Sequence, residues 1–104
     1  MLVVVDAENV RRSLWPNLSR EELVARARCW AAREGHELLI VFDGEAPEQA
    51  SDLRGSAYAD DEIVRIATGL DVPCWLVTSD RALRERVGDR AERVVGGGTF
   101  ARLL

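Results

Sequence analysis

The chain has 104 residues, of which 47% are hydrophobic and 31% charged, and this balance is typical of one small globular domain with a single core. All of its basic residues are arginines, which excludes lysine-dependent sites such as P-loops and Schiff-base centres. The formal net charge of −4 argues weakly against nonspecific binding to nucleic acid, which depends on basic surface.

The sequence also favours a cytoplasmic location. No apolar run approaches the ~20 residues needed to cross a bilayer, and Asp6 interrupts the first apolar run, so we expect no signal peptide and no membrane partner. Cys29 and Cys74 belong to no metal-binding or redox motif and are typical of a reducing compartment. The single histidine, His36, nearly excludes Ser-His-Asp triads and histidine-based metal sites.

The first half of the chain predicts a strand followed by helical segments. Leu2–Val5 is apolar at every position, as expected for a strand that is covered on both faces. After Asp6, a short helix or turn is predicted over Val10–Leu14, and Pro16 ends it. The next helix begins with an S-x-x-E capping box, Ser19 to Glu22. Its apolar residues repeat at helical spacing up to Gly35, and they are Leu23, Val24, Ala27, Trp30 and Ala31.

The second half continues the alternation. Leu38–Phe42 predicts a second buried strand, whereas the polar stretch Glu45–Gly55 predicts a loop. A helix is predicted from Asp60 to Gly69. The remaining predicted elements are a strand over Cys74–Val77, a short helix containing Leu83 and Val87, a strand over Arg93–Val95, a turn at Gly96–Gly98 and a terminal helical turn over Thr99–Leu104.

Strands that alternate with helices indicate βαβ units and parallel pairing. We therefore predict an α/β fold over residues 1–104. It is a single three-layer domain with a mostly parallel sheet of about four strands and flanking helices.

Acidic residues follow three of the predicted strands. Asp6, Asp43 and Asp80 stand at or just after the strand ends, and Asp60 and Asp61 open a helix. Because the carboxyl ends of parallel strands share one edge of the sheet, these carboxylates are expected to lie in one cleft. Crowded carboxylates repel one another and a cation removes the repulsion, so the pattern predicts a site for Mg²⁺ or Mn²⁺. The predicted ligands are Asp6, Asp60 or Asp61, and Asp80, with Asp43 as a fourth acid.

Each aspartate taken alone also fits a structural role. A residue at a strand exit commonly caps the next helix, and Asp80 fits this role well. The joint pattern of acids at several strand ends is what favours a site. Asn9 and Ser79 are candidates for orienting a water or a phosphate, with turn and helix-capping roles as the alternatives.

Arginine and aromatic residues near the expected cleft are further candidates. Guanidinium groups make forked contacts with phosphates, and Arg11 and Arg81 are the chosen candidates among the arginines near the cleft edge. Trp15 is interpreted as a lid that packs on the sheet, with base stacking as the alternative. Tyr58 is undecided.

Four short motifs, in this order, resemble the YacP-like branch of the NYN domains, which look like PIN-domain nucleases. The motifs are D-A-E-N (Asp6–Asn9), V-F-D-G (Val41–Gly44), A-D-D-E-I (Ala59–Ile63) and T-S-D-R (Thr78–Arg81). The resemblance covers nearly the whole chain and implies a PIN-like parallel sheet with metal-dependent cleavage of RNA. By position, the resemblance carries the site over to Asp6, Asn9, Asp43, Asp60 and Asp80, and the adjacent Asp61 could substitute for Asp60 or assist it.

The chain departs from this family pattern in two places. The stretch between Asp43 and Asp60 is short, and the strand expected there is missing or reduced. In the first motif Ala7 and Glu8 replace a glycine, which places an extra acid near the site. The first departure bears on how the substrate is held more than on metal binding.

The resulting functional prediction is a cytoplasmic endoribonuclease that cleaves RNA with metal-activated water. The implied products carry a 3′-hydroxyl and a 5′-phosphate. A homodimer or a partner, such as a ribosome or an RNA-processing complex, would help this acidic chain to hold RNA. The alternatives are a noncatalytic PIN-like module that binds RNA or protein, and a small-molecule phosphohydrolase, which the missing D-x-D motif disfavours.

Overall fold

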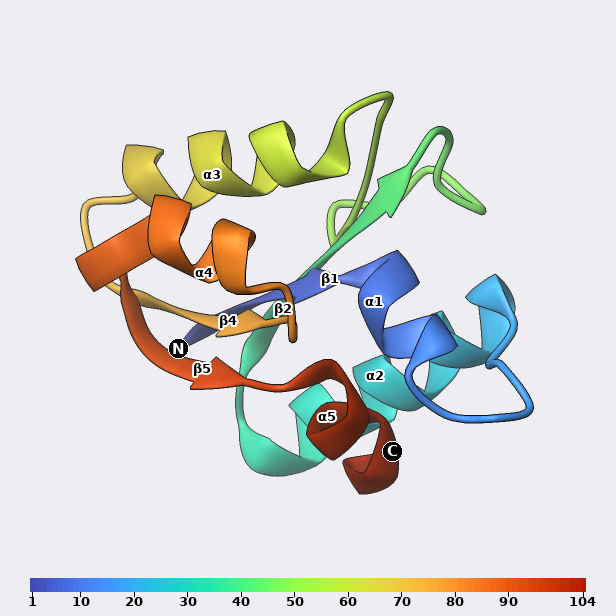
Figure 1. The fold of residues 1–104 in the computed structure, drawn as a ribbon. Coiled ribbons are helices and arrows are strands. Elements are labelled where there is room, and N and C mark those ends of the chain that lie inside the picture. Colours follow the sequence, from blue (N-terminus) through green and yellow to red (C-terminus); the bar gives the residue numbers. More distant parts are fainter.

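Five parallel strands form one sheet in the order β3-β2-β1-β4-β5, as the computed structural model of residues 1–104 shows (Figure 1). The strands are β1 (Leu2–Asp6), β2 (Glu37–Asp43), β3 (Leu53–Ser56), β4 (Cys74–Val77) and β5 (Ala91–Val95). The helices are α1 (Ala7–Arg12), α2 (Arg20–Glu34), α3 (Ala59–Gly69), α4 (Arg81–Val87) and α5 (Gly97–Leu103), with a short 3₁₀ turn over Gly88–Arg90.

Helices cover both faces of the sheet, so the predicted three-layer α/β domain is confirmed (Figure 1). Side chains alternate along β1, as they must in a strand. Val3 and Val5 pack with α1, α2 and α5 on one face, whereas Val4 packs with α3 and α4 on the other. All three valines are fully buried, which explains why this strand is apolar at every position.

The sheet has one strand more than the sequence predicted. Leu53–Ser56 lies within and just beyond the predicted loop Glu45–Gly55, yet it pairs in parallel with the carboxyl half of β2. Only Leu53 of this strand is buried, and the segment lacks the β-branched run that marks a strand. Its position at the sheet edge and its pairing with β2 are tertiary effects, which the local sequence does not reveal.

The edge strand is held by contacts with distant residues. Arg28 of α2 hydrogen-bonds both carboxylate oxygens of Asp52, at 2.7 and 2.8 Å, and also reaches Glu48 at 3.0 Å. A Cβ on Gly55 would collide with the carbonyl oxygen of Gly44 and lie 2.8 Å from the nitrogen of Ala46. Only glycine therefore allows this close approach of β3 to the turn after β2.

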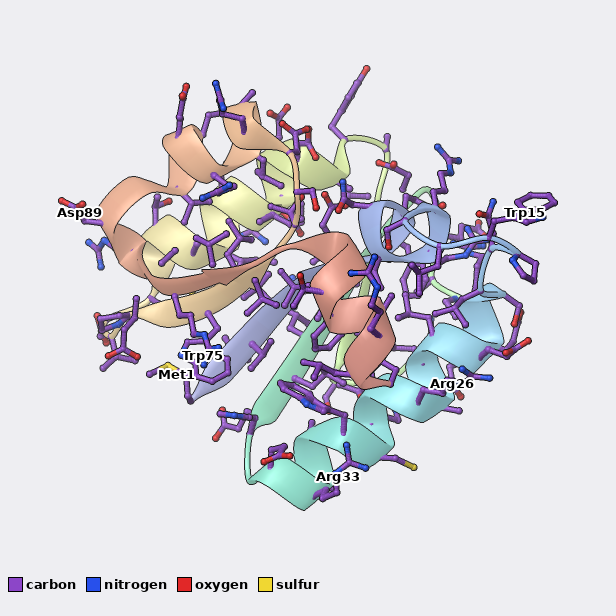
Figure 2. The ribbon with its side chains drawn as sticks, turned by 60° about the horizontal axis from the view of Figure 1, so that its bottom comes forward. Met1, Trp15, Arg26, Arg33, Trp75 and Asp89 are labelled. Carbon is purple, nitrogen blue, oxygen red and sulfur yellow. The ribbon has the colours of Figure 1, made fainter.

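Helix α2 begins and ends where the sequence predicted. The hydroxyl of Ser19 accepts a hydrogen bond from the backbone nitrogen of Glu22 at 3.0 Å. Gly35 ends the helix with φ at 73°, in the left-handed region. Arg26 and Arg33 project from the exposed side of α2 (Figure 2).

Aromatic side chains pack together at the end of the sheet where the strands begin. Trp75 and Met1 lie at the end where β1 begins, and Trp15 lies at the opposite end (Figure 2). His36 stacks on Trp30 with ring centroids 5.2 Å apart, and the ring centroids of His36 and Trp75 are 4.5 Å apart, so aromatic packing closes the amino-terminal end.

No helix has the length and apolar character required of a membrane span.

Candidate active site

A cleft opens at the carboxyl ends of the central strands. From β1 the chain proceeds to β2 and β3 on one side of the sheet, and then returns to β4 and β5 on the other side. Ligands of open α/β folds bind at such a reversal of winding, here between β1 and β4. The cleft has a volume of about 440 Å³ and no hydrophobic lining residue, and it is lined by Asp6, Glu8, Asn9, Arg12, Ser13, Asp43, Asp60 and Ser79.

Asp6 is the buried acid of the cleft. Asp6 is only 7% exposed. Its Oδ2 accepts a hydrogen bond of 2.8 Å from the hydroxyl of Thr78. The pKa of Asp6 is raised to about 6, chiefly by burial and in addition by the negative charges of Asp60 and Asp43, whereas the Thr78 hydrogen bond opposes the rise. Asp6 is therefore an acid whose ionised form lacks a compensating positive charge.

Asp43 and Asp60 come to the cleft from β2 and α3. The Oδ1 of Asp43 accepts a hydrogen bond of 3.3 Å from the nitrogen of Ala59, the first residue of α3, and this contact ties the two elements together. Partial burial raises the pKa of Asp60, and the charges of Asp80 and Asp43 add to the effect. The carboxylates thus interact electrostatically across three elements.

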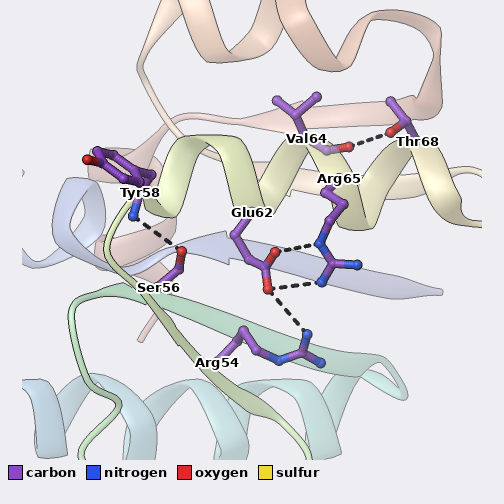
Figure 3. Close-up of polar contacts among 7 residues, drawn as sticks. All are labelled: Arg54, Ser56, Tyr58, Glu62, Val64, Arg65 and Thr68. Atoms are coloured by element: carbon purple, nitrogen blue, oxygen red, sulfur yellow. Dashed lines mark hydrogen bonds and ion pairs between the residues drawn. The ribbon is translucent and has the colours of Figure 1, made fainter.

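Asp60 differs from the two acids that follow it. Asp61 is bound by Arg86 at 2.7 Å. Glu62 is bound by Arg65 at 2.6 Å and by Arg54 at 3.5 Å (Figure 3). The side chain of Asp60 makes no hydrogen bond or ion pair, and Asp60 lines the cleft. Of the two alternatives that the sequence left open, the structure brings Asp60 into the cleft and leaves Asp61 on the surface.

Asp80 has a structural role beside the cleft. Its Oδ1 accepts a hydrogen bond of 3.2 Å from the nitrogen of Leu83 and so caps α4, as the capping alternative predicted. Its own nitrogen donates to the hydroxyl of Thr78 at 3.1 Å. Asp80 does not line the cleft, although its charge raises the pKa of Asp60.

The donor set of the cleft fits a hard divalent cation. In the present side-chain positions no group of three or more carboxylate, histidine or cysteine side chains stands close enough to hold a metal ion. However, Asp6, Asp43 and Asp60 share one cleft, and the pKa of Asp6 is raised by burial and also by the charges of Asp60 and Asp43. Mg²⁺ and Mn²⁺ need only one or two protein carboxylates each, because waters and substrate oxygens complete the shell.

Asn9 and Ser79 connect separate elements at this edge of the sheet. The Oδ1 of Asn9 accepts a hydrogen bond of 2.9 Å from the nitrogen of Ser79, and the hydroxyl of Ser79 accepts one of 2.8 Å from the nitrogen of Gly97. Helix α1, the loop after β4 and the start of α5 are thereby joined. Gly97, at the start of α5, had no predicted role, because the sequence indicated only a turn there.

The arginine that lines the cleft is Arg12, rather than either of the two chosen candidates. Arg11 donates to the carbonyl oxygen of Leu18 at 2.9 Å and to Glu8 at 2.6 Å. Arg81 lines a separate depression beside Arg84. Helix α1 starts at Ala7, three residues earlier than predicted, and this start places Glu8 and Arg12 one turn apart on the cleft side.

Two exposed aromatic residues stand in the segments next to the cleft. Trp15 is 88% exposed and points into solvent, so its interpretation as a lid on the sheet is wrong (Figure 2). Tyr58 is 73% exposed and precedes α3, where its nitrogen donates to the hydroxyl of Ser56 (Figure 3). The remaining aromatic residues are buried or half-buried.

Comparison of the chain with protein-family models, with curated proteins and with solved structures finds no match. The resemblance to YacP-like NYN domains therefore stays a prediction.

Proposed function

We propose that this chain is a metal-dependent endoribonuclease of the PIN-like, YacP/NYN type. The observation that carries the proposal is the group of three carboxylates, Asp6, Asp43 and Asp60, which line a cleft without hydrophobic residues at the reversal of strand order. Burial and mutual repulsion raise the pKa of Asp6 and Asp60, and a divalent cation would relieve that cost.

The residues divide into ligands and groups that hold the substrate. Asp6 and Asp60 would hold Mg²⁺ or Mn²⁺, with Asp43 and Asp80 contributing through water. A bound divalent cation lowers the pKa of a water molecule and stabilises negative charge on a phosphate. Asn9 and Ser79 orient the scissile phosphate, and the exposed guanidinium of Arg12 steadies it. The expected products carry a 3′-hydroxyl and a 5′-phosphate.

The charge of the chain determines how RNA is held. A net charge of −4 argues weakly against holding a nucleic acid by charge alone. We therefore propose that binding in the cytoplasm depends on the bound cation, on stacking by exposed aromatic residues, and on a second copy of the chain or an RNA-bearing partner.

RNA cleavage by the purified protein tests the proposal. Structured and single-stranded RNAs are incubated with Mn²⁺, with Mg²⁺ and with chelator, for the wild type and for Asp6→Asn, Asp60→Asn and Asp89→Asn. Asp89 is an exposed aspartate far from the cleft and serves as the matched control (Figure 2). Cleavage that needs metal, is lost in the first two variants and persists in the third is the expected result.

Two other outcomes would point elsewhere. Cleavage that persists in chelator would contradict the role of the carboxylates. Metal-independent binding of RNA without cleavage would instead support the noncatalytic module.

A further inference from the structure

Backbone hydrogen bonds in the cleft fix which atoms of Asn9 face outward. The nitrogen of Ser79 is a backbone donor, so the Asn9 atom that lies 2.9 Å away must be the carbonyl oxygen, Oδ1. This contact settles the orientation of the amide. The Nδ2 group of Asn9 makes no hydrogen bond within the protein and belongs to a residue that lines the cleft. Asn9 therefore presents a hydrogen-bond donor to a ligand.

The same reasoning applies to Ser79. Its hydroxyl oxygen accepts from the nitrogen of Gly97 at 2.8 Å, while the hydroxyl hydrogen has no acceptor within the protein. Ser79 also lines the cleft. Two neighbouring side chains are thus held so that an acceptor of each is occupied by a backbone N–H and a donor of each remains available.

Gly97 maintains this arrangement by lacking a side chain. A Cβ at this position would collide with Oδ1 of Asn9 and would lie 3.2 Å from the carbonyl oxygen of Asn9. Gly98, the next residue in the same helical turn, has no such restriction, because its Cβ would meet nothing closer than 3.8 Å. The two glycines therefore form a matched pair that differs in contact with Asn9.

We infer that Nδ2 of Asn9 and the hydroxyl of Ser79 form a donor pair for a nonbridging oxygen of a phosphodiester, and that Gly97 is the positioning residue of the pair. The inference rests on the proposed function and adds which atoms of the two residues meet the phosphate and which residue positions them. Ionised carboxylates and phosphate oxygens are both hydrogen-bond acceptors, so the carboxylates of the cleft cannot donate to a phosphate. A phosphate placed between the two groups meets the cation-binding side on one flank and hydrogen-bond donors on the other.

Gly97→Ala and Gly98→Ala are compared first, because neither changes the charge. The probe is a short fluorescein-labelled single-stranded RNA, and its binding is followed by anisotropy with Ca²⁺ present while a gel monitors cleavage. Hydrogen bonds to charged groups contribute enough for a loss of about 10- to 100-fold in affinity. We expect this loss for Gly97→Ala and wild-type affinity for Gly98→Ala.

Further variants separate positioning from general damage to the fold. Asn9→Asp keeps the acceptor for Ser79 and replaces the donor, so it should weaken RNA binding while Mn²⁺ affinity, measured by calorimetry, does not fall. Ser79→Ala should weaken binding, and Ser79→Thr, which keeps the hydroxyl, should restore most of it. In spectra of ¹⁵N-labelled protein, the side-chain amide signal of Asn9 should shift on addition of RNA in the wild type and not in Gly97→Ala.

The outcomes separate this inference from the proposed function. If Gly97→Ala binds RNA more weakly and the wild type does not cleave it, the donor pair is supported and the proposed nuclease activity is contradicted. If the wild type cleaves RNA, and both glycine variants and Asn9→Asp bind RNA as tightly as the wild type, the nuclease activity is supported and the donor pair is overturned. Absence of RNA binding by the wild type would overturn both.

Discussion

At the scale of single residues, the position of Asp6 carries most of the functional argument. The carboxylate stands at the end of a fully apolar strand, and its hydrogen-bond partner is the neutral hydroxyl of Thr78. Two other acids near the cleft are compensated, since Glu8 pairs with Arg11 and Asp61 pairs with Arg86, whereas Asp60 has no such partner. A residue that is costly for folding and lies in a cleft is a candidate for function.

Replacing Asp6 with asparagine is expected to stabilise the metal-free protein at neutral pH. The pKa of Asp6 is raised to about 6 in the folded state from 3.8, so the folded state binds the proton more tightly and the free energy of unfolding falls as pH rises through this window. Asp6→Asn removes the cost of ionisation. The gain should reach about 1–3 kcal/mol above about pH 7 and should vanish toward pH ~4.

Urea unfolding in chelator at several pH values measures the effect. Asp89→Asn is the control and should follow the wild type at every pH. A loss of stability in Asp6→Asn at neutral pH would show instead that Asp6 is chiefly a structural acceptor for Thr78.

Replacing Trp15 with alanine is expected to separate folding from RNA binding. The side chain is 88% exposed, so the free energy of unfolding should change by less than about 0.5 kcal/mol. RNA binding should weaken by about 1–3 kcal/mol, because the remaining interpretation of Trp15 is stacking on a base. Val72→Ala, at an exposed residue in the turn before β4, is the control in the same anisotropy assay. Equal RNA binding by Trp15→Ala and Val72→Ala would show that Trp15 does not contact the RNA.

At the scale of elements, β3 connects Asp43 of the cleft with the start of α3. The strand pairs Ser56 with Asp43, and the same edge leads into α3, whose first residue donates to Asp43. Most other elements were predicted from local patterns, including the cap of α2 at Ser19 and its end at Gly35. The β3 strand was missed because its pairing depends on Arg28 and Gly55, which contact residues far away or across a turn.

Replacing Gly55 with alanine is expected to destabilise the protein by about 1–3 kcal/mol, the usual cost of overpacking. The added Cβ would meet the backbone of Gly44–Ala46, which cannot move away as a flexible side chain does. Gly69→Ala, at the last residue of α3 with open space around it, should be neutral or stabilising by up to about 1 kcal/mol. Thermal and urea unfolding compare the two. Equal stability would mean that the turn after β2 adapts freely.

At the scale of the whole molecule, the order of the strands brings the acids together. Asp6, Asp43 and Asp60 lie on β1, β2 and α3, and the reversal between β1 and β4 opens the space that they line. The helices on both faces bury the sheet, so the carboxyl edge is where the polar groups of the loops can gather. A ligand that binds there would hold these separate elements together.

Manganese is therefore expected to stabilise the folded chain. A ligand that binds only the folded state at about 100 times its dissociation constant adds about 2.7 kcal/mol. Because protons compete for Asp6, whose pKa is about 6, the rise in melting temperature should be larger at pH ~7.5 than at pH ~5. The rise should be lost in Asp6→Asn and kept in Asp89→Asn. An equal rise in all three proteins would indicate binding elsewhere on the acidic surface.

The sequence by itself determined the alternation of strands and helices and the placement of aspartates at strand ends, because apolar periodicity and helix signals are local properties of the chain. Only the tertiary structure decided which polar residues reach the cleft. Asp60 rather than Asp61 and Arg12 rather than Arg11 line it, because the phase of each helix and its ion pairs determine which side chain faces inward. The edge strand and the contact of Gly97 with Asn9 likewise depend on segments far apart in the chain, whose meeting no local pattern encodes.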